Sequence, residues 1–295
     1  MLSLADLAAL RATYAREAEL PVTPVTLGDV VVGGDEPVIM GTLNLSRDST
    51  YRESVAVSTE SALRKARVQI AQGAAVVDVG AESSTARAAR VDAEEQLARL
   101  IPVISEIAAE TVVSVETYEP QVVEECLKSG ARVLNMTGRE HEEQMLELAA
   151  EHGAGVVLCF TEAANVREPA RLDLGADPVP ALVDHFGPRL EKARAAGVED
   201  LVVDPGMGFY YANLTDPMTR ARHQARVLLH SFRLRELGVP VCNALPHAFD
   251  LFEEEFRTAE GFFAVLASLG GTHLFRTHEV AHVRAVLGAV SALST

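Results

Sequence analysis

Four polar side chains stand at the ends of short apolar runs, each directly after a leucine or a valine. They are Asn44, Glu116, Asn135 and Asp204. An unpartnered polar group inside a protein costs about 1–3 kcal/mol, so we expect these four to meet a ligand. A carboxylate accepts paired N–H bonds, and a carboxamide both donates and accepts. The set is therefore suited to a flat nitrogen heterocycle with an amidine-like donor edge.

Two basic side chains, Arg276 and His278, follow the last apolar run of the chain. We expect them at the rim of the same site, where they could hold an anionic group of the ligand. Glu116, Asp204 and His278 could instead form a carboxylate–imidazole metal site, but no H-x-H or H-E-x-x-H spacing supports it. A Mg²⁺ ion bridged by the substrate needs only one or two protein oxygens and is easier to accommodate.

The elements that must position these residues are short β-branched runs, which alternate with longer segments of helical period. We expect eight strands, at 38–45, 76–79, 112–115, 133–135, 155–160, 201–204, 239–243 and 272–276. Helices are expected at 58–72, 93–109, 120–128, 142–151, 179–195, 219–237, 259–269 and 280–293. Six glycines that follow these helices are expected in the left-handed conformation typical of helix ends. They are Gly73, Gly130, Gly153, Gly197, Gly238 and Gly270.

This alternation allows either a closed (β/α)8 TIM barrel or an open, doubly wound α/β sheet. No G-x-G-x-x-G motif follows the first strand, which argues against a dinucleotide-binding open sheet, and the count of eight favours the barrel. The catalytic groups of such barrels lie at the C-terminal ends of the strands and in the loops that follow. Residues 36–295 would form the barrel. Residues 1–35 would form an extension, in which Leu4, Leu7, Leu10 and Tyr14 predict a helix packed on the barrel.

The charge balance argues against nucleic acids and anionic membranes as partners. The chain has 42 acidic and 26 basic residues, a net charge of −16, and such a protein repels phosphate groups at long range. The arginine-rich stretch 220–235 has apolar residues at helical spacing and is interpreted as a surface helix. No stretch predicts a membrane span. The three cysteines form no C-x-x-C pair and no signal peptide is evident, so we expect a cytoplasmic protein.

Six segments of the chain carry recognisable motifs. They are IMGTLNLSRDS at 39–49, GAAVVDVGAES at 73–83, SVETY at 114–118, GARVLN at 130–135, VDPGMGF at 203–209 and FRTHEV at 275–280. In this order they resemble the signatures of the dihydropteroate synthases, which belong to the pterin-binding barrel superfamily. The resemblance extends from about residue 37 to the end of the chain and implies the same barrel fold.

The resemblance implies an enzyme that joins the methylene group of a dihydropterin diphosphate to the amine of 4-aminobenzoate and expels diphosphate. A pterin or a folate would then be its small-molecule partner. Asn135 and Asp204 would bind the pterin ring, and Glu116 would do so in place of the family's aspartate. Met207 and Phe209, in the matched segment 203–209, are assigned to the same ligand.

The resemblance also implies how the diphosphate is held. Asn44 would contact the diphosphate or its Mg²⁺ ion, while Arg276 and His278 would hold the anion. Such contacts stabilise the charge that develops on a leaving group. The resemblance further implies a homodimer.

Two departures from the family's motifs concern the substrate site. The resemblance implies that the lysine of the S-R-K motif contacts the pterin, that its serine helps frame the amine site, and that the E-S-T-R-P-G loop closes over 4-aminobenzoate. The S-R-K motif after the seventh strand is replaced by CNALPH at 242–247, which contains no lysine or arginine. The E-S-T-R-P-G loop reads ESSTAR at 82–87. We therefore expect a divergent transferase whose acceptor need not be 4-aminobenzoate. A folate-dependent one-carbon (methyl) transferase and a non-catalytic pterin-binding paralogue are the alternatives.

Overall fold

A computed structural model describes residues 3–46, 55–56, 58–83, 90–161, 163–166, 173, 175–207 and 213–293. Its centre is a sheet of eight parallel strands in the order β8-β7-β6-β5-β4-β3-β10-β9. The strands are β3 (Val38–Asn44), β4 (Val76–Gly80), β5 (Val112–Glu116), β6 (Val133–Met136), β7 (Gly155–Cys159), β8 (Leu201–Asp204), β9 (Cys242–Ala244) and β10 (Leu274–Thr277). The Val203 N–H donates to the Pro240 carbonyl at 3.1 Å, which links the two ends of the sheet. The predicted (β/α)8 barrel is confirmed.

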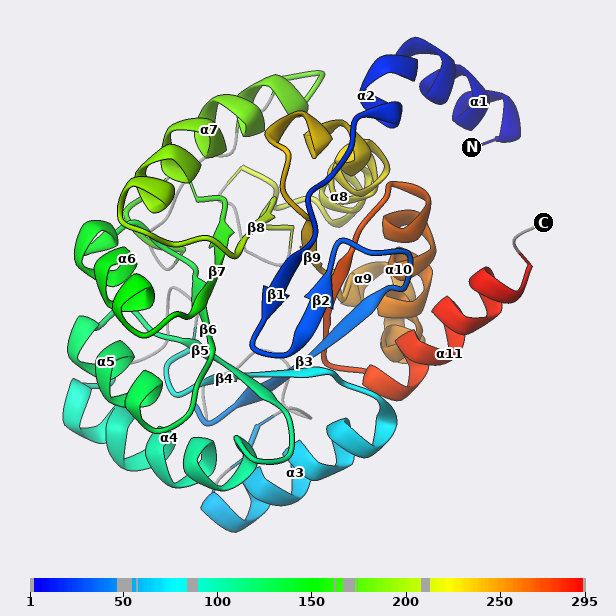
Figure 1. Ribbon diagram of the computed structural model, residues 1–295. Helices are drawn as coiled ribbons and strands as arrows, with labels where there is room; N and C mark the ends of the chain where they lie inside the picture. Colours follow the sequence, from blue (N-terminus) through cyan, green and yellow to red (C-terminus); the bar gives the residue numbers. More distant parts are fainter. Residues whose placement is uncertain are drawn as a thin grey trace.

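Helices surround this barrel on its outer face (Figure 1). They are α3 (Thr59–Gln72), α4 (Ala93–Ile107), α5 (Pro120–Lys128), α6 (Glu142–Glu151), α7 (Val179–Ala195), α8 (Pro217–His230), η2 (Ser231–Leu237), α9 (Phe249–Phe252), η3 (Glu253–Thr258), α10 (Ala259–Leu269) and α11 (Val280–Ala292). The expected helix 219–237 is divided between α8 and η2, and the expected strand 239–243 begins later, at Cys242. The short elements α9 and η3 were not expected.

Helix α4 shows how the sequence determines such an element. The Asp92 side chain accepts a hydrogen bond from the Glu95 N–H and so caps the first turn. Leu100, Val103 and Ile107 recur at helical spacing and are fully buried. This apolar stripe faces the barrel, and its burial provides most of the helix's stability.

Glycines end most of these helices as expected, with one exception. Gly73, at the end of α3, has φ +106°, and Gly130, Gly153, Gly197 and Gly238 also have positive φ. Gly270 instead has φ −83°, and the next residue, Gly271, adopts the left-handed conformation. A side chain on Gly270 would place its Cβ 1.8 Å from the Leu228 carbonyl oxygen. Close packing against α8 therefore requires glycine there, not a left-handed turn.

The arginine-rich stretch is only partly a surface helix. Arg220 and Arg226 donate to the carbonyl oxygens of Leu214 and Ala176, at 3.3 and 3.2 Å. Arg233, in η2, is 6% exposed and bonds the Asp177 carboxylate at 2.7 Å. These guanidinium groups are thus used within the fold. No helix in the part of the chain that the structure describes is long and apolar enough to cross a membrane.

The extension before β3 contains α1 (Leu4–Thr13), α2 (Ala15–Glu19) and a hairpin of β1 (Val25–Leu27) and β2 (Val30–Val32). The predicted helix is present as α1; none of its residues is fully buried, but Leu7 and Leu10 are partly buried and pack against the core. Tyr14 adds a cation–π contact, because the centre of its ring lies 3.6 Å from the Arg233 guanidinium.

The β1–β2 hairpin was not expected, since three-residue strands give little sequence signal. It crosses one end of the barrel (Figure 1). Leu27 is fully buried, and a Cβ on Gly155, the first residue of β7, would lie 2.4 Å from its Cδ2 atom. The hairpin therefore covers the N-terminal end of the barrel, the face that in TIM barrels serves stability.

Replacing Leu27 with alanine is expected to lower the free energy of unfolding by about 3 kcal/mol, because it leaves a cavity under the hairpin. Val31 is 56% exposed in the same hairpin, and its replacement with alanine is expected to change stability by less than about 0.5 kcal/mol. Urea unfolding of both variants measures the difference. Equal stabilities would show that the hairpin does not share the barrel's core.

Candidate active site at the C-terminal end of the barrel

A buried carboxylate, Asp78, lies at the centre of the polar cluster inside the barrel. It belongs to β4 and is 1% exposed. Its Oδ1 atom accepts from the Ser114 hydroxyl at 2.7 Å, and its Oδ2 atom accepts from the Asn135 amide at 2.9 Å. The strands β4, β5 and β6 are neighbours, with Asp78 directly opposite Ser114 in register. Adjacent parallel strands thus bring the three side chains together.

Arg276 lies within this cluster and not at its rim. Its Nε atom is 3.7 Å from Asp78 Oδ2, and its Nη2 atom is 3.7 Å from Glu116 Oε2. Burial opposes the charge on the guanidinium, but Glu116 and Asp78 outweigh it and raise the pKa of Arg276. Its Nη1 atom is buried and has no hydrogen-bond partner among the described residues. One arginine therefore compensates two buried carboxylates and keeps one donor for a ligand.

Glu116 ends β5 directly opposite Asn135 of β6. Its Oε1 atom lies 3.2 Å from the Thr137 hydroxyl, which also lies 3.1 Å from the Tyr118 hydroxyl. Burial raises the pKa of Glu116 from 4.5 to about 7, with Arg276 opposing the rise and Asp78 adding to it. Near neutral pH this carboxyl can therefore either donate or accept a proton.

The raised pKa of Glu116 predicts a dependence of stability on pH. The protonated Glu116 carboxyl adds to the free energy of unfolding. This contribution is fully present below the pKa of the unfolded state, near 4.5, and is lost as the pH rises through about 7. Relative to E116Q, the wild-type free energy of unfolding is expected to fall by about 2 kcal/mol between pH 5 and pH 8. Denaturant unfolding of both proteins across this range measures the difference. Parallel pH profiles would contradict the burial of an ionisable group at this position.

Asp204 ends β8 and is fully buried. Its Oδ1 atom accepts from the Gly206 N–H at 2.8 Å, and Gly206 can present this group because it adopts φ +76°. Its Oδ2 atom has no hydrogen bond of ordinary geometry among the described residues, although the Cys242 thiol and the Ala244 N–H approach the carboxylate. Burial raises the pKa of Asp204, and Arg276 opposes this. A buried carboxylate oxygen in this state is a ready acceptor for ligand N–H groups.

The remaining expected residues lie close to the same end of the barrel, as far as they are described. Asn135 is 1% exposed, and its Oδ1 atom accepts from the Cys159 thiol at 3.2 Å. Asn44 ends β3 opposite Gly80 and is half-buried. Met207 follows β8 and is buried. Phe209 lies outside the described residues.

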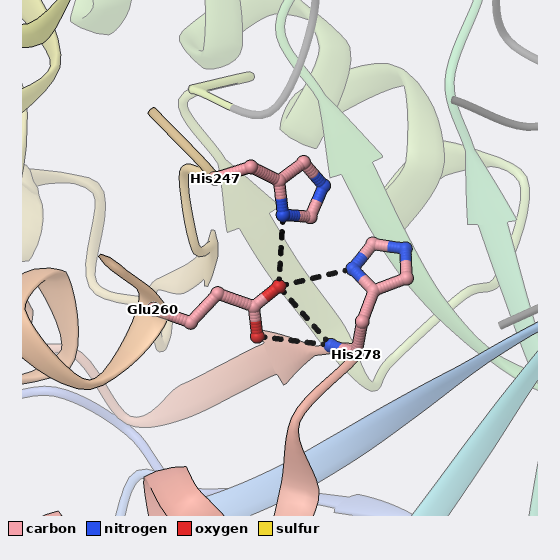
Figure 2. A group of neighbouring side chains, drawn as sticks. All are labelled: His247, Glu260 and His278. Atoms are coloured by element: carbon pink, nitrogen blue, oxygen red, sulfur yellow. Dashed lines mark hydrogen bonds and ion pairs between the residues drawn. The ribbon is translucent and has the colours of Figure 1, made fainter. Parts of the chain in front are cut away.

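His278, directly after β10, belongs to a second cluster with His247 and Glu260 (Figure 2). The Glu260 Oε1 atom lies 3.1 Å from the Nδ1 atom of each imidazole. Burial alone would raise the pKa of Glu260, but the imidazoles of His247 and His278 beside the carboxylate hold it well below its ordinary value. Burial lowers the pKa of His278, and its bond to Glu260 opposes this. Among the described residues, this set and not Glu116, Asp204 and His278 places its ligand atoms within reach of one ion.

Sequence patterns gave no expected role to Asp78, His247 and Glu260. Asp78 is a polar residue within the apolar run Val76–Gly80. Asp204 was identified by a similar signal, but Asp204 ends its run whereas Asp78 lies in the middle of its own. His247 lies in the segment that departs from the family's motif. Glu260 lies in the first turn of α10, 18 residues before His278, and no spacing rule connects the two.

Comparisons with known proteins agree with this architecture. The family described as pterin binding enzyme matches residues 40–278. Dihydropteroate synthase of Escherichia coli K12 is 32% identical over 251 residues, covering 83% of this chain and 87% of that protein. A protein of Mycobacterium tuberculosis H37Rv named inactive dihydropteroate synthase 2 is also 32% identical, over 281 residues, covering 89% of this chain and 84% of that protein.

Solved structures show the same fold. Xanthomonas albilineans dihydropteroate synthase with 4-aminobenzoic acid superposes with a TM-score of 0.76 at 26% identity, covering 92% of this chain and 97% of the other. The Thermus thermophilus enzyme in complex with 4-aminobenzoate gives 0.75 at 28% identity, covering 92% and 100%. The resemblance inferred from the six sequence motifs is confirmed, and this chain belongs to the pterin-binding enzyme family, as a relative of the dihydropteroate synthases.

Proposed function

We propose that this protein is a transferase that binds a 6-hydroxymethyl-dihydropterin diphosphate at the C-terminal end of the barrel and joins it to an acceptor other than 4-aminobenzoate. The observation that carries the proposal is the buried set of Asp78, Asn135 and Asp204, in which Asp204 Oδ2 has no ordinary hydrogen bond among the described residues. Membership of the pterin-binding family supports the ligand class.

The proposed pterin contacts follow from the chemistry of the ring. A pterin presents an amide N–H and an exocyclic amino group side by side, and a carboxylate accepts both in parallel. Asp204 would accept these two bonds, with Asn135 and Glu116 contacting the other polar edge of the ring. Met207 and Phe209, in the segment that follows Asp204, would supply apolar contacts to the ring.

The proposed diphosphate contacts are N–H donors, namely the charged guanidinium of Arg276 and the imidazole of His278. Arg276, in β10, has a buried Nη1 donor without a partner among the described residues. His278 directly follows the same strand. Both would hold the anion and stabilise the charge that develops when the C–O bond breaks. Asn44 offers one neutral oxygen, which fits a Mg²⁺ ion bridged by the substrate but not an ion held by protein ligands alone.

The acceptor is proposed to differ from 4-aminobenzoate because of the segment 242–247. This segment contains no lysine or arginine. Asn243 is fully buried, and its amide donates to the Thr272 hydroxyl at 2.7 Å and to the Ser231 hydroxyl at 3.2 Å. The amide nitrogen of Asn243 is therefore committed to contacts within the fold, and the residue contributes no positive charge to the substrate site.

Calorimetry with pterin-6-carboxylate and with the pterin diphosphate tests the binding step. Release of diphosphate is then measured with 4-aminobenzoate and with a panel of other amines and thiols. We expect pterin binding, and release that depends on an acceptor other than 4-aminobenzoate. Absence of binding at millimolar pterin would contradict the proposal.

A non-catalytic pterin-binding paralogue is the second candidate. Two observations favour it: the similarity to the mycobacterial protein named inactive dihydropteroate synthase 2, and the absence of a lysine or arginine at 242–247. Pterin binding without diphosphate release, for every acceptor tried, would identify this case. The homodimer implied by the resemblance is tested separately by light scattering of the purified protein.

A further inference from the structure

We propose that His247, Glu260 and His278 form a binding site for one divalent transition metal ion, with zinc as the best fit. The site lies at the C-terminal end of the barrel and differs from the Mg²⁺ contact predicted at Asn44. Three separate segments build it: His247 follows β9, His278 follows β10, and Glu260 lies in the first turn of α10. Because β9 and β10 are paired in parallel, their C-terminal ends bring the two histidines together.

The three side chains converge as the ligands of one ion do (Figure 2). Glu260 Oε1 is 3.1 Å from Nδ1 of His247 and 3.1 Å from Nδ1 of His278. The ligand atoms of all three residues lie within 4.8 Å of one another. Zinc binds imidazole nitrogen and carboxylate oxygen at about 2.1 Å, so neighbouring ligand atoms of a tetrahedral ion are about 3.4 Å apart. Only small side-chain rotations are needed to reach this geometry.

Glu260 is held in the orientation that a ligand requires. It is 1% exposed, and its Oε2 atom accepts from the Thr277 hydroxyl and from the N–H groups of His278 and Glu279, at 3.0 and 3.2 Å. These three donors fix the carboxylate, as outer hydrogen bonds commonly fix metal ligands. They leave Oε1 directed toward both imidazoles. A buried carboxylate is most stable opposite a cation, and the described contacts of Glu260 include no lysine or arginine.

The ligand types indicate which ion binds. Two imidazoles and one carboxylate suit zinc and its first-row neighbours better than Mg²⁺ or Ca²⁺, which prefer oxygen ligands alone. Three protein ligands leave a coordination position for water or for an oxygen of an anionic ligand. With neutral imidazoles the set carries a charge of −1, and a bound dication would change this to +1. If the proposed function holds, this positive charge would lie beside His278, where the diphosphate is expected.

Metal binding is tested on the full-length protein without any pterin, so its outcome does not depend on the proposed function. After treatment with a chelator, the protein is titrated with Zn²⁺ by calorimetry. We expect one ion per chain with a Kd of about 1 µM or lower. Co²⁺ is expected to give the visible absorption bands of a four- or five-coordinate ion with nitrogen and oxygen ligands.

Variants separate this site from non-specific binding and from a purely hydrogen-bonded cluster. H247A and H278A are each expected to weaken Zn²⁺ binding by at least about a hundredfold. H282A is the matched control, because His282 is exposed on α11 four positions after His278, and it is expected to bind like wild type. Thermal unfolding without metal checks that each variant folds. Absence of stoichiometric binding to wild type, or equal affinities in H247A, H278A and wild type, would overturn the proposal and leave a carboxylate–histidine hydrogen-bond cluster.

Discussion

Replacing Asp204 with asparagine is expected to weaken pterin binding by at least about a hundredfold. The amide group turns one acceptor into a donor, which would face the N–H donors of the ring. Hydrogen bonds to a charged group contribute about 1.5–3 kcal/mol each. The amide loses one of the two bonds, leaves a ring donor unpaired and makes the remaining bond neutral, which together removes about 3 kcal/mol. The variant is expected to fold, because burial already raises the pKa of Asp204 and so disfavours its charged form. A neutral amide of the same size avoids this cost.

Calorimetry with pterin-6-carboxylate measures this effect on D204N and wild type. The matched control is D29N, which makes the same chemical change in the exposed turn between β1 and β2, at the opposite end of the barrel. D29N is expected to bind the pterin as wild type does. Equal affinities for D204N and D29N, with both variants folded by circular dichroism, would show that Asp204 does not contact the ring.

Replacing Arg276 with methionine is expected to lower the free energy of unfolding by about 4 kcal/mol, because removing one partner of a buried ion pair leaves the other charge uncompensated. Here the one guanidinium lies 3.7 Å from both Asp78 and Glu116. Methionine fills a similar volume, so the loss reports mainly on charge. In R276M the pKa of Glu116 is expected to rise further, since Arg276 is the group that lowers it most. The destabilisation is therefore expected to increase from pH 5 to pH 8.

A double variant distinguishes this electrostatic effect from a packing defect. R276M/E116Q is expected to recover part of the lost stability at pH 8, because the neutral amide no longer needs a cation. Guanidinium unfolding of the single and double variants gives the coupling energy between the two positions. R11M, which removes an arginine with a 53% exposed side chain, is expected to change stability by less than about 0.5 kcal/mol. A loss in R276M that is independent of pH and additive with E116Q would contradict the electrostatic explanation.

The barrel could be predicted from the sequence because its signals are local. Strands buried on both faces form continuous β-branched runs, and helices such as α4 repeat their apolar residues every three or four positions. The hairpin of β1 and β2 could not be predicted, because each strand has only three residues. Its stability comes from Leu27 packing under Gly155, a contact between residues far apart in the chain.

The polar cluster could be predicted where a member is recognisable within its own strand, as a polar residue at the end of an apolar run. Asn135 and Asp204 each end an apolar run, and parallel strands place such ends at one edge of the sheet. The sequence alone therefore determined the fold class, the family and most of the residues in the cluster around Asp78. Only the tertiary structure determined that Arg276 lies between Asp78 and Glu116, and that Glu260 joins His247 and His278. These pairings depend on distances of a few ångströms between separate strands and helices, and a linear pattern carries no information about such distances.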